Sequence, residues 1–192
     1  MTNLGAKREV ATMATTPPRR PEDGANARPK PPRKVKRTLT AGNFFKTVAN
    51  VVASSPVLLA ALVRPKTSAA LREKVMLGVT SVTDCRYCQW GHTHWAMAHG
   101  VPLEEINQIL GHQVESLHAD DPAQVAAILF AQHCAENLDA VDPEAMANLR
   151  AHFGEAQSAE ILAYARAITL GSLAGNTVDA FLDRFRIAVG RK

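Results

Sequence analysis

The chain has 192 residues, of which 46% are hydrophobic, and it contains three cysteines. This apolar content is enough for a packed core and excludes disorder along the whole chain, while three cysteines are too few for the disulfide scaffold of a small secreted protein. The formal net charge of +4 is compatible with nucleic-acid binding. Whether it indicates such binding depends on where the charged residues lie in the sequence. No uninterrupted apolar run reaches the roughly 20 residues that span a bilayer, and we expect no membrane partner.

The positive charge is concentrated in the first 38 residues. They hold ten Lys/Arg against three acidic side chains, a balance of +7, whereas residues 39–192 have a balance of −3. The same segment contains six of the eleven prolines and no aromatic residue. We therefore predict that residues 1–38 form a disordered, basic, proline-rich tail and that residues 39–192 form the folded domain.

The composition of this tail argues against most targeting functions. It lacks the apolar stretch of a secretory signal, and its prolines and acids argue against a mitochondrial presequence, so we expect a cytoplasmic protein. The basic run from Lys30 to Arg37 would contact nucleic acid only weakly and without specificity. The favoured interpretation is a solvated extension, or an overcalled start with Met13 as the initiator.

From Ala41 onward the pattern predicts helices. Helix starts are indicated where a proline follows a capping or apolar residue: Ser55-Pro56, Val101-Pro102, Asp121-Pro122 and Asp142-Pro143. Helix ends are indicated at glycines: Gly100, Gly111, Gly154 and Gly175. Apolar residues at spacings of three and four lie between them. The sequence therefore predicts an all-α domain of seven or eight helices between residues 41 and 189, with no strand.

Two thiols and an imidazole share one face of the helix predicted from Asp84, its expected N-cap, to Gly100. Cys85, Cys88 and His92 fall at i, i+3 and i+7, within a stripe about 60° wide. The amino end of a helix favours a thiolate, and His92, one turn after Cys88, can act as its base. A thiolate near a base, with a second thiol to trap a sulfenic acid, is what a thiol peroxidase needs.

Structural zinc is the main alternative for this motif, because Cys-x-x-Cys with His92 and His99 is a possible ligand set. On one helix, however, Cys85 and His99 are separated by about 20 Å, too far for one ion, so we predict no metal and no bound cofactor. A thioredoxin-type site is disfavoured because its strand-and-helix context is missing. Cys134, on an apolar helix without a basic neighbour, is predicted to be a core residue.

These residues resemble the AhpD-like alkylhydroperoxidase and carboxymuconolactone decarboxylase superfamily, in its peroxidase branch. The resemblance is carried by Glu73, by Cys85-Arg86-Tyr87-Cys88 and by His92, with Gly100 and Glu104-Glu105-Ile106 closing the unit. It implies that Cys88 is the thiolate that peroxide attacks and that Cys85 is the proton donor and resolving thiol. It also implies that Glu73 and His92 form a relay that deprotonates Cys88.

The resemblance further implies an all-helical protomer that assembles into homotrimers or homohexamers. The implied substrates are organic hydroperoxides, and the implied reductant is an external dithiol such as that of a lipoyl-bearing protein. Other branches of the superfamily leave a lactone decarboxylase as an alternative, although that branch generally lacks the cysteine pair. A non-enzymatic redox sensor whose tail binds a polyanion is the third interpretation.

Glu73 can join this site only if the chain reverses direction. In one continuous helix it would lie about 18 Å from Cys85, so we predict that residues 80–84 break the helix and let two helices pack side by side. The neighbouring Arg72 and Lys74 are expected to be solvated charges. The helix dipole favours Cys85 as the more acidic thiol, but we choose Cys88, because a base within reach outweighs a dipole worth roughly 0.3–1 kcal/mol.

Overall fold

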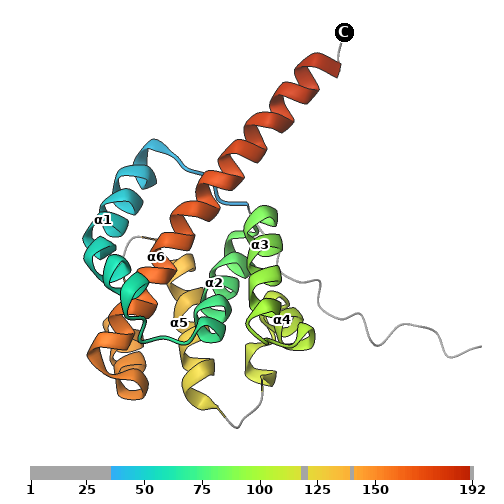
Figure 1. Cartoon of the computed structure of the whole chain (residues 1–192). Coiled ribbons are helices and arrows are strands. Elements are labelled where there is room, and N and C mark those ends of the chain that lie inside the picture. Colours follow the sequence, from blue (N-terminus) through green and yellow to red (C-terminus); the bar gives the residue numbers. More distant parts are fainter. Residues whose placement is uncertain (1–35, 118–120, 139–140, 191–192) are drawn as a thin grey trace, which may run out of the picture. The chain divides into compact units, whose positions relative to one another are not determined.

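The computed structural model describes residues 36–117, 121–138 and 141–190 (Figure 1). Within these ranges the chain is helical and has no strand, which confirms the predicted all-α class. The elements are α1 (Ala41–Val63), α2 (Ala69–Thr83), α3 (Arg86–Ala98), α4 (Leu103–Leu110), a short 3₁₀ turn (Val114–Ser116), α5 (Pro122–Glu136) and α6 (Pro143–Gly190). The predicted tail lies outside the described residues except for residues 36–38, so its disorder stays a prediction.

These ranges hold six α-helices, slightly fewer than the seven or eight predicted, because two expected boundaries lie inside helices. The first is Pro56, which is part of α1. Proline has no N–H to donate to the carbonyl of Val52, four residues earlier. The Ser55 hydroxyl donates to that carbonyl instead, at 2.7 Å, and the helix continues. The second is Gly175, through which α6 runs without a break.

Most other boundary predictions are confirmed. Asp121 caps α5 through its carboxylate, which accepts the backbone N–H of Gln124 at 3.0 Å, and α6 begins at Pro143. Gly100 and Gly154 both have the positive φ that favours glycine, +82° and +70°. Gly154 interrupts α6, which is therefore two helical stretches in sequence.

The chain reversal that Glu73 requires occurs at a single residue. Helix α2 continues to Thr83, so the break falls at the last residue of the predicted range 80–84. The hydroxyl groups near the end of α2 bond to its own carbonyls: Thr80 to Leu77, Ser81 to Gly78 and Thr83 to Val79. Asp84 then adopts a left-handed conformation, with φ 53° and ψ 40°. Cys85, and not Asp84 as predicted, is the N-cap of α3.

Helix α2 lies at the centre of the domain. It packs against α3, α4, α5 and α6, and its residues Val75, Leu77 and Val79 have no exposed surface. Lys74 was predicted to be solvated, but it is 8% exposed and forms an ion pair of 2.6 Å with Glu105 of α4. The partner on another helix explains the burial, and it could not be read from the local sequence.

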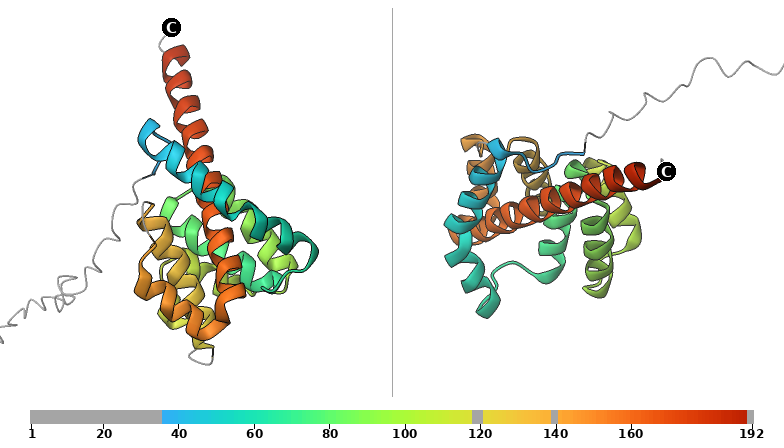
Figure 2. Two further views of the ribbon diagram at one scale, coloured as in Figure 1. Left: turned by 90° about the vertical axis from the view of Figure 1, so that its left-hand side faces the viewer. Right: turned by 90° about the horizontal axis from the view of Figure 1, so that it is seen from above.

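Helix α1 packs along α6, and the C-terminal part of α6 extends beyond the other helices (Figures 1 and 2). In the described part of the chain, α1 is the one helix long and apolar enough to cross a membrane by length and composition, with a mean hydropathy of 1.6. Only 17% of that stretch is buried, and Phe45 and Leu62 are 73% and 81% exposed. Such a face is also typical of a helix that packs on another protein.

At Gly175, helix α6 packs closely against the cysteine motif. A Cβ atom at this position would lie 2.9 Å from Cys85 Sγ, whereas one at Gly171, on the same helix, would meet nothing within 4 Å. We expect Gly175→Ala to lower the free energy of unfolding by about 1–3 kcal/mol. Gly171→Ala should raise it by roughly 0.5–1 kcal/mol, because it gains helix propensity without a clash. Thermal unfolding of both variants checks this, and equal stabilisation by the two would contradict the close contact.

Candidate functional site: a dithiol beside a buried glutamate–histidine pair

Glu73 and His92 meet across the interface of α2 and α3. His92 Nδ1 and Glu73 Oε2 are 2.7 Å apart, and the two residues are 7% and 2% exposed. Burial alone would raise the pKa of Glu73, but hydrogen bonds from His92 and Arg72 outweigh burial and lower it. An ionised Glu73 can only accept a hydrogen bond, so Nδ1 of His92 carries the proton and Nε2 is left for proton exchange.

Arg72 holds the second oxygen of this carboxylate. Its Nε and one terminal nitrogen lie 3.0 and 2.9 Å from Glu73 Oε1. Arg72 was predicted to be a solvated charge, but its side chain is 33% exposed and is committed to Glu73. Because both carboxylate oxygens are bonded, the orientation of Glu73 toward His92 is fixed.

The two thiols of the motif lie together at the start of α3. Both are free cysteines, and their Sγ atoms form a hydrogen bond of 2.8 Å. Cys85 is fully buried, whereas Cys88, one turn into the helix, is only partly buried. A molecule from solvent therefore reaches Cys88 more readily than Cys85.

The resting electrostatics of this pair favour Cys85 as the thiolate. The hydrogen bond from Cys88 lowers the pKa of Cys85 to about 6, and the nearby N–H groups of Cys88 and Tyr87 at the helix start add to the effect. The same bond, together with burial, raises the pKa of Cys88. This is opposite to the predicted order of acidity. The reason is that no hydrogen bond in the described residues joins His92 to either sulfur, while Cys85 occupies the N-cap.

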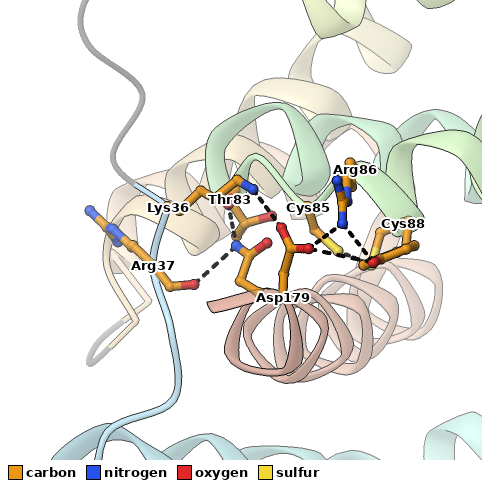
Figure 3. A network of polar contacts seen from close by, with 9 residues as sticks. Lys36, Arg37, Thr83, Cys85, Arg86, Cys88 and Asp179 are labelled. Carbon is orange, nitrogen blue, oxygen red and sulfur yellow. Dashed lines mark hydrogen bonds and ion pairs between the residues drawn. The ribbon is translucent and has the colours of Figure 1, made fainter. Parts of the chain in front are cut away.

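Residues 83–88, which we call the cysteine turn, join α2 to α3. Helix α6 and the chain segment before α1 pack against this turn (Figure 3). Asn176 is 2% exposed, and its side-chain amide donates to the carbonyls of Thr83 and Arg37 at 2.7 and 3.0 Å. It thus joins the end of α2 to the segment before α1, and both to α6.

Asp179, one turn further along α6, anchors the start of α3. It forms ion pairs with Lys36, at 2.7 Å, and with Arg86, and these two cations keep its pKa low. Sequence reasoning missed Asn176 and Asp179 as parts of the site. The available signal was a set of small and polar residues at helical spacing on an otherwise apolar helix, which includes Gly175 and Ser172.

A pocket of about 300 Å³ opens beside the Glu73–His92 pair. It is lined by Arg72, Glu73, Met76, His92, Trp95 and His99, and the Trp95 ring contacts His92 edge-on at 5.2 Å between centroids. Neither sulfur lines it. A smaller cavity of about 60 Å³ lies beside Cys134 and Arg166 and shares no residue with the predicted site.

The structure thus brings the four predicted residues together as two pairs, Glu73–His92 and Cys85–Cys88, linked by one turn of α3 between Cys88 and His92. Cys134 is 9% exposed within the core cluster, and burial raises its pKa to about 12. This confirms its predicted core position. In the described residues, no three His, Cys, Asp or Glu side chains gather in a way that could hold a metal ion.

These observations define a class of protein: an all-helical domain with a dithiol at the start of a helix, beside a buried carboxylate–imidazole pair. Residues 57–133 match the model of the carboxymuconolactone decarboxylase family. This segment runs from α1 to α5 and contains all four predicted site residues. The predicted superfamily is thereby confirmed, while the peroxidase branch stays a prediction. No match was found among the curated proteins or among the solved structures.

The low pKa of Cys85 predicts that the pair carries one thiolate at neutral pH. Below pH 6 both thiols are protonated, and above it Cys85 loses its proton, so the ultraviolet absorbance of thiolate should rise by one equivalent with a midpoint near pH 6. Cys134 should not contribute, because its pKa is raised to about 12. The double variant Cys85→Ser/Cys88→Ser is the control and should show no step. A midpoint near the ordinary cysteine value of about 8.5 would contradict the hydrogen-bonded pair.

Proposed function

We propose that this protein is a thiol-dependent peroxidase that reduces organic hydroperoxides to alcohols through a Cys85/Cys88 dithiol–disulfide cycle. The observation that carries the proposal is the 2.8 Å contact between two free thiols at a helix start. One turn along the same helix lies a buried imidazole bonded to a carboxylate. These are the groups that peroxide reduction by thiols requires.

The cycle begins with a proton shift between the sulfurs. At neutral pH the pair holds one proton, and its transfer across 2.8 Å from Cys88 to Cys85 turns the more accessible sulfur into the thiolate. The Cys88 thiolate attacks the terminal peroxide oxygen, the O–O bond breaks, and Cys88 becomes a sulfenic acid. The leaving alkoxide takes the proton from the Cys85 thiol, which yields the alcohol and a Cys85 thiolate.

The second step forms the disulfide. The Cys85 thiolate attacks the sulfenic sulfur of Cys88, and hydroxide leaves with the transferred oxygen. A proton from the His92–Glu73 pair, or from solvent, converts this hydroxide to water. In total the pair gives up two electrons and its one proton, the second proton comes from the His92–Glu73 pair or solvent, and the hydroperoxide becomes an alcohol and water.

In this proposal, Glu73 and His92 supply and accept protons. The carboxylate fixes His92 through Nδ1, which leaves Nε2, on a ring one turn of α3 from Cys88, to exchange protons. A dithiol reductant then regenerates the thiols by exchange at the accessible sulfur. Arg86, Tyr87 and Trp90 surround this end of α3 and are exposed, which supports access for a partner as large as a lipoyl-bearing protein.

Turnover with an organic hydroperoxide and a dithiol tests the proposal. Cys88→Ser should abolish reduction of cumene hydroperoxide, because it removes the sulfur that accepts oxygen. Cys134→Ser is the matched control: it is the same substitution at a core cysteine, and it should retain most of the activity. Undiminished turnover by Cys88→Ser would refute the proposal.

The matched family favours a second candidate, decarboxylation of a carboxylated lactone, which is the reaction its name describes. That chemistry uses no dithiol. Alkylation of the two thiols should therefore spare decarboxylation of a γ-carboxymuconolactone analogue, whereas it should eliminate peroxide reduction.

We also propose that the protein assembles with copies of itself, as a trimer or hexamer. Support comes from large apolar side chains left exposed on α1 and on the end of α6, including Phe45, Leu62 and Phe181, which are 73%, 81% and 68% exposed. Light scattering should give a mass several times 20.7 kDa, and Phe45→Ser/Leu62→Ser should lower it. A monomeric parent chain would contradict assembly.

A further inference from the structure

One face of α6 lies against the cysteine turn. Four residues at i, i+3, i+4 and i+7 form this face: Ser172, Gly175, Asn176 and Asp179. Three of them contact the cysteine turn. Gly175 packs against Cys85 Sγ, Asn176 donates a hydrogen bond to the carbonyl of Thr83 at the end of α2, and Asp179 forms an ion pair with Arg86. Ser172, the fourth, lies one turn before Gly175 and Asn176.

The hydroxyl of Ser172 is buried and unpaired. Ser172 has no exposed surface, and its Oγ has no hydrogen-bond partner of good geometry in the described structure. Native proteins keep few such groups, because a buried hydroxyl without a partner is costly. Gly175, one turn along the same face, lies against Cys85 Sγ, which is 2.8 Å from Cys88 Sγ. In keeping with this placement, Cys85 and burial raise the pKa of Cys88, and the Ser172 hydroxyl lowers it.

The charge state of Cys88 determines whether this hydroxyl has a good partner. A neutral thiol is a weak acceptor, whereas a thiolate is a strong one. The hydroxyl is therefore poorly satisfied in the resting pair, in which Cys85 carries the charge. It becomes satisfied when the proton moves and Cys88 becomes the anion.

We propose that Ser172 is a further catalytic residue, whose hydroxyl donates a hydrogen bond to Cys88 Sγ when that sulfur is the thiolate. This inference rests on the proposed peroxidase function for its role in turnover, but the contact itself does not depend on it. No bond to Ser172 forms or breaks: its proton stays on Oγ while the Cys88 sulfur accepts oxygen. The effect is to favour the proton shift that makes Cys88 the nucleophile.

The size of the effect follows from two opposing terms. Loss of one hydrogen bond to the anion should raise the pKa of Cys88 by about one unit, which lowers the thiolate fraction about tenfold. The thiolate that remains is about threefold more nucleophilic, because nucleophilicity follows pKa with a coefficient of about 0.4–0.5. Ser172→Ala should therefore slow the reaction of Cys88 about threefold at neutral pH.

The test measures the titration of Cys88 without peroxide. In a Cys85→Ser background, so that only Cys88 titrates within the motif, alkylation by iodoacetamide is followed against pH and assigned to peptides by mass spectrometry. Ser172→Ala should move the midpoint for Cys88 upward by about one pH unit. Ser158→Ala is the matched control, because Ser158 is also on α6, has no exposed surface and carries an unpaired hydroxyl. It should leave the midpoint unchanged.

Cys134 reports folding in the same experiment, since it is buried and should stay unlabelled in the folded chain. If Ser172→Ala exposes Cys134, Ser172→Gly removes the same hydroxyl and replaces it in the test. An unchanged Cys88 midpoint in the folded variant overturns the inference, even if the parent chain reduces peroxide. A shifted midpoint supports the contact even if the parent chain reduces none, and in that case only the peroxidase proposal fails.

Discussion

The arrangement of the site depends on the one-residue reversal at Asp84. Because Asp84 adopts the left-handed conformation, α2 keeps its helical hydrogen bonds to its last turn, and α3 begins after the N-cap residue Cys85. Two helices that are adjacent in sequence thereby pack side by side, and Glu73, twelve residues before Cys85, reaches the imidazole of His92. A longer loop would separate the two pairs, and a continuous helix would put Glu73 far from the thiols.

The reversal also explains the electrostatics of the dithiol. It puts Cys85 at the N-cap of α3, where backbone N–H groups are unpaired and negative charge is favoured. Cys88 lies one turn further along, in contact with Cys85 and closer to solvent. One sulfur is therefore suited to hold the resting charge and the other to meet a substrate, with a proton shift of 2.8 Å connecting the two states.

Much of this site could be predicted from local spacing. The i, i+3 interval brings Cys85 and Cys88 together on any helix, and the capping residues before proline predicted the starts of α5 and α6. The Glu73–His92 contact needed the family resemblance, because no local pattern shows that two helices pack side by side. Gly175 was misjudged because glycine usually ends a helix, whereas here its missing side chain makes room for Cys85 Sγ. Lys74 was misjudged because its partner, Glu105, lies on another helix.

The central claim is that Cys85 and Cys88 act as one two-electron donor to hydroperoxide, and its most direct test is a stoichiometric titration of the reduced chain without added reductant. One equivalent of cumene hydroperoxide should consume two of the three thiols and yield one equivalent of alcohol. Peptide mapping should find a Cys85–Cys88 disulfide and a free Cys134. Alcohol formation with all three thiols retained, or a persistently free Cys85–Cys88 pair after excess hydroperoxide, would contradict the account.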